Sequence, residues 1–139
     1  GDGTQNAAWA AGGLTSVSPG DKSDCTEEYN GTSWSASNDM ITSRARHGGA
    51  GTQNAAVIFG GISPSTVSCT EEYDGSTWSV SSAMINIIST HGGAGTQAAA
   101  LSIGGRTGPS ATSLACTEEY NRAHSGAQYL LTKKIKAQE

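Results

Sequence analysis

The stretch His47–Tyr73, HGGAGTQNAAVIFGGISPSTVSCTEEY, decides the fold, because its parts occur three times along the chain. Gly-Thr-Gln begins at residues 3, 51 and 95, and Cys-Thr-Glu-Glu-Tyr begins at residues 25, 69 and 116. Copies of the first motif are 48 and 44 residues apart, and copies of the second are 44 and 47 residues apart. Such a period indicates a repeat architecture, in which each unit buries its apolar surface by stacking on its neighbours.

The repeated unit predicts a meander of four short antiparallel strands. Ala55–Phe59 is a short apolar run typical of a strand that is buried on both faces. Gly60-Gly61 can adopt positive φ and end that strand. Val67–Tyr73 is the next strand, and Asp74-Gly75 is a hairpin signal that leads into a last strand at Thr77–Val80. A glycine-rich segment before the apolar run completes the four.

The repeats divide the chain into three units and a tail. The predicted boundaries are 1–46, 47–90 and 91–121 for the repeats, and 122–139 for a divergent segment that caps the array or contacts another subunit. The third unit has Ser125 where the first two have Trp34 and Trp78, so the signature of its fourth strand is lost. Residues 128–136 fit a strand or a short helix. Because the chain opens inside a repeat and without Met, we expect a processed protein or a piece of a longer one.

Composition supports small stacked sheets and excludes several function classes. Only 35% of the 139 residues are hydrophobic and 6% are aromatic, while 19 are glycine, so large side chains cannot fill one thick core. The net charge of −4 argues against a nucleic-acid partner, which needs clustered Lys and Arg. No apolar run is long enough to predict a membrane span.

These motifs resemble kelch repeats, the blades of β-propellers. Val57-Ile58-Phe59-Gly60-Gly61, Glu71-Glu72-Tyr73-Asp74 and Thr77-Trp78 stand where a kelch unit has its apolar strand, its Tyr and its Trp, and Arg44 and Arg46 precede the first strand. The resemblance covers residues 3–121 and implies an all-β fold of about three four-stranded antiparallel blades. Propellers close with about four to eight blades, so we expect oligomerisation to complete the ring. The near-identity of the copies is similar to that of kelch-like repeats in tail-fibre proteins of aquatic bacteriophages.

The resemblance also implies a set of structural residues that recur in each repeat. They are Gly12, Gly13, Glu27, Tyr29, Trp34, Gly60, Gly61, Glu71, Tyr73, Trp78, Gly104, Gly105, Glu118 and Tyr120. We expect the two tryptophans to pack between blades.

No residue pattern predicts catalysis, a metal or another cofactor. Adjacent residues of a strand face opposite sides, so the paired Glu of each repeat cannot flank one glycosidic bond. We expect one Glu of each pair to accept hydrogen bonds from backbone or from an Arg, and the other to face solvent. Equivalent histidines at His47 and His91 predict hydrogen bonding rather than metal binding. The three cysteines lie too far apart to pair if whole sheets stack, and we expect them to be small buried hydrophobes.

Binding is expected in the loops between the second and third strands, which vary most between repeats. The candidate residues are Thr15, Ser18, Asp21, Lys22, Asp24, Arg106, Ser110 and Thr112. The leading hypothesis is a non-enzymatic structural or adhesion module on a virion or extracellular surface, whose partners are copies of itself or neighbouring surface proteins. The alternative is a carbohydrate-binding propeller whose loops recognise glycans. A propeller oxidase or glycosidase is a third class, disfavoured because its reactive residue types sit at repeated positions.

Overall fold

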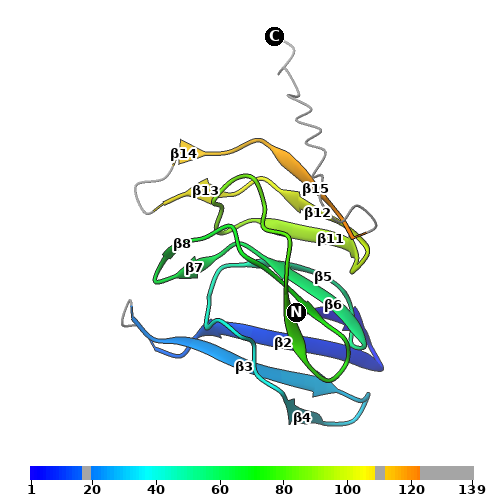
Figure 1. Cartoon of the computed structure of the whole chain (residues 1–139). Helices are drawn as coiled ribbons and strands as arrows, with labels where there is room; N and C mark the ends of the chain where they lie inside the picture. The colour runs from blue at the N-terminus through cyan, green and yellow to red at the C-terminus, as the bar shows by residue number, and fades with distance from the viewer. Residues whose placement is uncertain (17–19, 109–111, 123–139) are drawn as a thin grey trace.

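A computed structural model describes residues 1–16, 20–108 and 112–122, and every regular element in those ranges is a β-strand. The strands form three antiparallel sheets that are stacked in chain order, with the first sheet at the bottom of Figure 1 and the third at the top. The prediction of an all-β fold is therefore confirmed. Within these residues, no helix is long and apolar enough to cross a membrane.

The first two sheets have the four strands that the repeat predicts. The first sheet runs in the order β1 (Asp2–Thr4), β2 (Ala7–Leu14), β3 (Lys22–Tyr29) and β4 (Trp34–Ser37). The second sheet contains β5 (Gly48–Thr52), β6 (Ala55–Phe59), β9 (Thr70–Tyr73) and β10 (Trp78–Ser81). The third sheet, as far as the structure describes it, has three strands: β11 (Gly92–Thr96), β12 (Ala99–Ile103) and β15 (Thr117–Asn121). Ser125 and the segment 128–136 lie outside the described residues.

Two short hairpins lie in the connections between the second and third strands of the second sheet and of the third sheet. One is formed by β7 (Ile62–Ser63) and β8 (Ser65–Thr66), and the other by β13 (Arg106–Thr107) and β14 (Thr112–Ser113). The sequence predicted only loops here. Isolated bridges join Ala45 to Ile62 and Ser89 to Arg106, so each hairpin is tied to the linker that enters its own repeat.

The middle sheet is buried on both faces, as its apolar second strand predicted. Trp9, Ala11, Met40, Ala56, Ile58, Tyr73 and Trp78 form one core between the first and second sheets. Ala50, Val57, Phe59 and Ala100 form a smaller one toward the third sheet, with Met84 and Tyr120 packed against it. Residues of β6 therefore alternate between the two cores, because successive side chains of a strand point to opposite faces. The first core contains three large aromatic side chains, Trp9, Tyr73 and Trp78, and the second contains Phe59 with Tyr120 beside it.

The paired glycines adopt the left-handed conformation that the sequence predicted. φ is 64° at Gly60 and 96° at Gly61, and the pairs at 12–13 and 104–105 are also positive. A side chain would also clash sterically here, because a Cβ on Gly60 would lie 2.5 Å from the carbonyl oxygen of Ile88. Glycine is needed here both for backbone conformation and for the close approach of the linker.

Two expectations about side-chain burial were wrong. Trp34 is 51% exposed, because no sheet in the described chain covers the outer side of the first sheet. Its ring packs on that of Tyr29, at a ring-centroid distance of 5.2 Å. Cys25 and Cys69 are exposed and Cys116 is intermediate, although all three are free thiols as expected. Cys69 directly precedes β9, and its backbone carbonyl accepts a hydrogen bond from the N–H of Gly60 at 3.0 Å.

Candidate functional site

A buried ion pair joins the second sheet to the linker that precedes it, and the backbone N–H of Arg44 in that linker donates to the carbonyl of Ser23 in the first sheet. Arg44 and Glu71 are 0% and 1% exposed, and the Nη2 of Arg44 contacts Oε1 of Glu71. The Nη1 of Arg44 donates to the carbonyl oxygens of Gly60 at 3.2 Å and Cys69 at 2.9 Å, while the backbone N–H of Ile41 donates to Glu71 Oε2 at 2.8 Å. Each charge is thus compensated inside a site that water does not reach, which is the condition for burying it without a large penalty.

The equivalent carboxylate of the third repeat is held by different donors. Glu118 accepts from the backbone N–H groups of Ile85 at 2.9 Å and Asn86 at 3.0 Å, and also from the side-chain amide of Asn86. Ile88, 1% exposed, stands where the preceding repeat has Arg44. The first Glu of a pair therefore accepts from the linker in both internal interfaces, as the sequence predicted, but only Glu71 uses an arginine.

The second Glu of a pair accepts a hydrogen bond from the tyrosine of the next sheet. Tyr73 Oη donates to Glu28 Oε1 at 2.5 Å, and Tyr120 Oη donates to Glu72 Oε1. The expectation that this Glu faces solvent is thus wrong for Glu72, which is 7% exposed. Burial raises the pKa of Tyr120 to about 12, and the hydrogen bond to Glu72 acts in the same direction. These hydroxyls therefore act as donors that join neighbouring sheets, and not as phenolates.

A tryptophan donor appears in one interface only. Trp78 Nε1 donates to Thr26 Oγ1 at 2.9 Å, and the Trp78 ring meets Trp9 edge-on at 6.0 Å. In the next interface, the equivalent Thr70 Oγ1 is buried and has no hydrogen-bond partner in the described structure. This difference follows from the sequence, because the third repeat has Ser125 at the tryptophan position.

Two equivalent histidines lie under the paired glycines. A Cβ on Gly12 would lie 2.9 Å from His47 Cε1, and one on Gly60 would lie 2.9 Å from His91 Cε1. His91 Nε2 accepts from the backbone N–H of Gly48 at 3.1 Å, so this nitrogen carries no proton. Burial, with the positive charge of Arg44 nearby, lowers the pKa of His47 to about 4, and burial also lowers that of His91. Both side chains are packed as neutral imidazoles.

The low histidine pKa values predict acid sensitivity. An unfolded His titrates near pH 6.5, so between about pH 6.5 and 4 the unfolded chain binds protons that native His47 does not. Stability should be fully present above pH 6.5 and should fall by up to about 3 kcal/mol as the pH drops to 4. Urea unfolding at a series of pH values measures this. The variant His47→Gln should flatten the dependence, and an equally steep curve in that variant would contradict the assignment.

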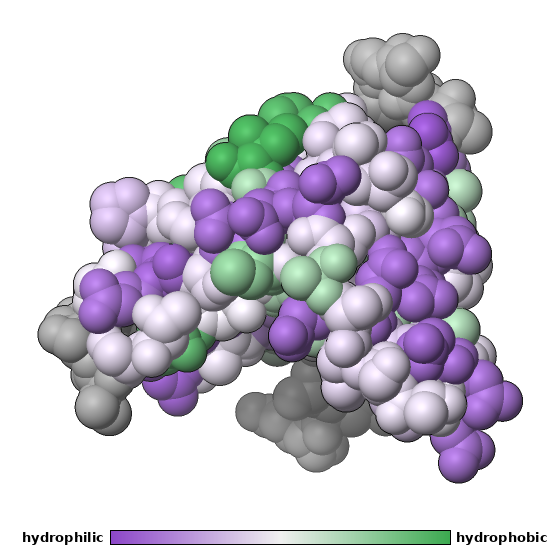
Figure 2. All heavy atoms as spheres, turned by 90° about the horizontal axis from the view of Figure 1, so that it is seen from below, coloured by the Kyte–Doolittle hydropathy of each residue, from purple (hydrophilic) through white to green (hydrophobic). Residues whose placement is uncertain are grey.

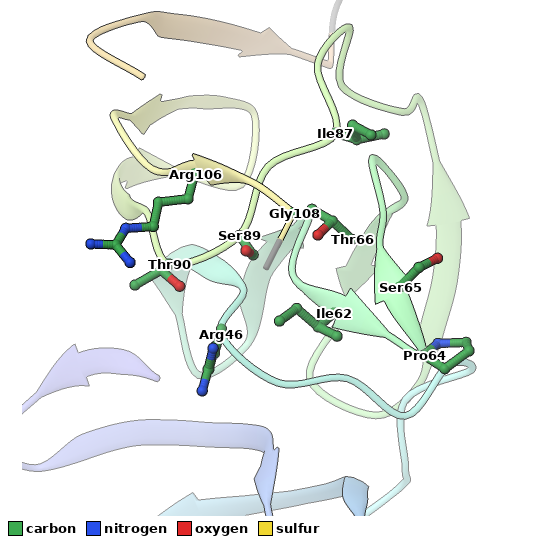
Figure 3. A pocket seen from close by; sticks show the side chains of 10 residues that line it. All are labelled: Arg46, Ile62, Pro64, Ser65, Thr66, Ile87, Ser89, Thr90, Arg106 and Gly108. Atoms are coloured by element: carbon green, nitrogen blue, oxygen red, sulfur yellow. The ribbon is translucent and has the colours of Figure 1, made fainter. Parts of the chain in front are cut away.

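A pocket of about 510 Å³ opens between the two small hairpins and the linkers beside them. Its lining residues are Arg46, Ile62, Pro64, Ser65, Thr66, Ile87, Ser89, Thr90, Arg106 and Gly108. Figure 3 shows Arg46 and Arg106 on one side of the pocket, with Thr90 between them. The two exposed arginines have no carboxylate partner among the described residues. An apolar floor with two guanidinium groups at the rim suits an anionic ligand.

Backbone strain occurs at this pocket. Arg46 and Thr90 occupy equivalent repeat positions and have φ of 56° and 55°. Positive φ is costly for a β-branched residue such as threonine, and strained residues cluster at functional sites. The backbone N–H of Thr90 donates to the carbonyl of Arg46 at 2.8 Å, which ties the two strained linkers together. The positive φ of Arg46 and Thr90 could not be predicted from the sequence, because neither Arg nor Thr is a residue type that indicates positive φ.

The loop residues predicted to bind are not gathered at one place by the structure. Arg106 lines the pocket, and Thr112 pairs with Thr107 in the same hairpin. Thr15 and Asp21 pair in the loop of the first sheet, where the backbone N–H of Thr15 donates to the Asp21 carbonyl at 3.0 Å. Lys22 and Asp24 belong to β3, and none of these four lines the pocket. Ser18 and Ser110 lie outside the described residues.

Within the ranges that the structure describes, no three His, Cys, Asp or Glu side chains are close enough to hold a metal ion. The six Glu of the three pairs are distributed over two internal interfaces and the two outer faces. What the arrangement can do is join sheet to sheet through repeated charged and polar contacts, and accept a small anion at the arginine rim.

No family model matches the chain, and no curated protein matches it. Solved structures do match this chain, 96 of them, and they define the class of fold as one of stacked antiparallel β-sheets. One of them, a structure of YjhT, has a TM-score of 0.66 and 14% identity to this chain. The alignment covers 84% of this chain and 41% of that one, so this chain spans less than half the length of the protein it matches.

Proposed function

We propose that this chain is a non-enzymatic structural and adhesion module, built of kelch-like β-propeller blades, that assembles with copies of itself on a virion or cell surface. The observation that carries the proposal is the repeated set of sheet-to-sheet contacts, in which Tyr73 and Tyr120 donate to Glu28 and Glu72 of the preceding sheet. The described repeats use their acidic and aromatic side chains for joining sheets. Large exposed hydrophobic residues remain on the outer sheets, among them Trp34 and Ile103.

The native mass tests this proposal. Analytical ultracentrifugation of the 139-residue chain, of 14.1 kDa, should give a defined oligomer at micromolar concentration. An antibody against the chain should label the surface of intact particles or cells that produce it. A monodisperse monomer at all concentrations would contradict assembly from copies, and turnover of a sugar substrate would contradict the non-enzymatic assignment.

A second candidate function is recognition of acidic glycans at the pocket. The favouring observation is the pair of guanidinium groups of Arg46 and Arg106, which no described carboxylate neutralises, above an apolar floor that includes Ile62 and Ile87. Sugars offer a carboxylate or sulfate for the arginines and an apolar ring face for the floor.

Replacing both arginines should abolish this selectivity. Each charged hydrogen bond contributes about 1.5–3 kcal/mol, so Arg46→Gln/Arg106→Gln should weaken binding of a uronic-acid oligosaccharide by more than tenfold. Isothermal titration calorimetry against that oligosaccharide and a neutral one of equal length measures the effect. Lys22→Gln removes a positive charge away from the pocket and serves as the matched control. Equal affinity of wild type for the two sugars would contradict the candidate function.

A further inference from the structure

We propose that the outer face of the first sheet binds the outer face of the third sheet of a second copy, in a head-to-tail contact that repeats the internal interfaces. The start face consists of Ala8, Ala10, Glu27, Tyr29 and Trp34. The end face consists of Leu101, Ile103, Thr117 and Glu119. This inference rests on the proposed function, because it names the partner and the contact by which copies assemble.

The internal interface between the first and second sheets defines what such a contact needs. One side supplies Trp9 and, on the neighbouring strand, the acceptors Thr26 and Glu28. The other side supplies the donors Tyr73 and Trp78, whose Oη and Nε1 reach Glu28 at 2.5 Å and Thr26 at 2.9 Å. In these tyrosine and tryptophan contacts, the acceptors lie on the face of a sheet that meets the next sheet, and the donors lie on the face that meets the preceding sheet.

The end face carries the acceptor side in the same register. Leu101 is paired with Glu119 across β12 and β15, as Trp9 is paired with Glu28 and Val57 with Glu72. Leu101 is 36% exposed and Ile103 is 47% exposed, whereas Val57 and Phe59 at the equivalent positions are 0% and 1% exposed. Leu101 and Ile103 are exposed because no sheet of the described chain covers this side of the third sheet.

The start face carries the donor side in the same register. Tyr29 is paired with Ala8 on one side and Trp34 on the other, as Tyr73 is paired with Ala56 and Trp78. Trp34 is 51% exposed, whereas Trp78 is 7% exposed. Figure 2, seen from the side on which the first sheet lies, shows hydrophilic and weakly hydrophobic residues side by side, with a strongly hydrophobic group at the upper left. Such a mixed surface suits a contact made of polar bonds around small apolar side chains.

Each face lacks the hydrogen-bond partner that the other face offers. The Tyr29 hydroxyl and the Glu119 carboxylate, unlike their counterparts in the internal interfaces, have no hydrogen-bond partner among the described residues. In a head-to-tail contact, Tyr29 Oη would donate to Glu119 and Trp34 Nε1 would donate to Thr117 Oγ1. The partner that supplies both is a second copy of this chain.

The contact is heterologous, since the two faces differ. Heterologous contacts close into a ring when the rotation permits and otherwise form a filament. Two copies hold six sheets, within the range of about four to eight at which propellers close. A two-copy ring with two identical head-to-tail contacts is the assembly we infer.

Complementation between two blocked variants tests the contact. Trp34→Asp blocks the start face, and Leu101→Asp/Glu119→Lys blocks the end face. Each variant alone should be a folded monomer, with the dissociation constant of the assembly raised at least about a hundredfold. An equimolar mixture should form dimers of about twice 14.1 kDa, since one intact contact remains. Val80→Asp, at a 73% exposed position of the middle sheet, should leave the wild-type assembly unchanged.

Sedimentation velocity of wild type, the two blocked variants, their mixture and Val80→Asp separates the outcomes. A wild-type monomer would contradict both this inference and the proposed function. A wild-type oligomer that persists in both blocked variants would overturn only the head-to-tail contact. Disruption by each variant with no recovery in the mixture would indicate that each face binds its own copy or another protein, and would likewise overturn it. Circular dichroism and urea unfolding establish that each variant is folded.

Discussion

Replacing Arg44 by isoleucine is expected to lower the free energy of unfolding by about 3–5 kcal/mol, because it leaves the Glu71 carboxylate buried without its positive partner. The carbonyls of Gly60 and Cys69 also lose a donor. Urea unfolding followed by circular dichroism measures the change. Arg46→Gln, at an exposed position two residues away, is the matched control and should change stability by less than about 0.5 kcal/mol.

The other internal interface suggests a second substitution that should restore part of the lost stability. Ile88 and Asn86 stand in the second internal interface where the first has Arg44 and Thr42, and Asn86 donates to Glu118 in place of a guanidinium. Adding Thr42→Asn to Arg44→Ile should therefore recover part of the lost stability. If the single variant is as stable as wild type, the ion pair does not hold these sheets together. If adding Thr42→Asn does not change the stability of the Arg44→Ile variant, an asparagine at this position does not replace the guanidinium as a donor to the buried carboxylate.

Replacing Gly93 by alanine is expected to destabilise the stack by about 3 kcal/mol, because it drives apart the inner strands β5 and β11. A Cβ on Gly93 would lie 2.3 Å from the carbonyl oxygen and 2.8 Å from the nitrogen of Gly49. Both are backbone atoms of a neighbouring sheet, so no side-chain rotation relieves the clash. The inner strands of this protein are glycine-rich for that reason.

The adjacent glycine is a close control. A Cβ on Gly92 would meet only the carbonyl oxygen of Ile103, at 3.9 Å, so Gly92→Ala should change stability by less than about 1 kcal/mol. Thermal and urea unfolding of the two variants give the comparison. Equal stability of Gly92→Ala and Gly93→Ala would show that the backbones of β5 and β11 do not approach as closely as described.

The repeats allowed much of the fold to be predicted. The alternation of Cys69, Glu71 and Tyr73 placed Glu71 and Tyr73 on one face, where Tyr73 contacts Glu28 of the first sheet and Glu71 contacts Arg44 of the linker. Gly60-Gly61 were predicted to break the strand with positive φ, which they do. These features depend on local chemistry and on strand periodicity, which a single sequence contains.

What could not be predicted depends on the neighbours of each repeat. Trp34 and Trp78 have similar sequence contexts, NGTSW and DGSTW, yet Trp78 is buried and Trp34 is exposed, because only Trp78 has a preceding sheet in the described chain. One Glu of each pair was expected in solvent, but Glu71 and Glu72 are both buried, and Tyr120, 48 residues later, donates to Glu72. The pocket brings together Arg46 and Arg106 from different linkers and hairpins, and no spacing rule in the sequence connects them.

Acrylamide quenching of tryptophan fluorescence across a dilution series tests the central claim most directly, namely that the open face of the first sheet is covered by another copy. Trp9 and Trp78 are 1% and 7% exposed within one chain, so Trp34, at 51%, is the one tryptophan whose accessibility depends on assembly. The variant Trp34→Phe identifies its signal. We predict that Trp34 is protected at concentrations where the chain is oligomeric and becomes quenchable on dilution to the monomer. Full quenching of Trp34 in the oligomer would contradict the account.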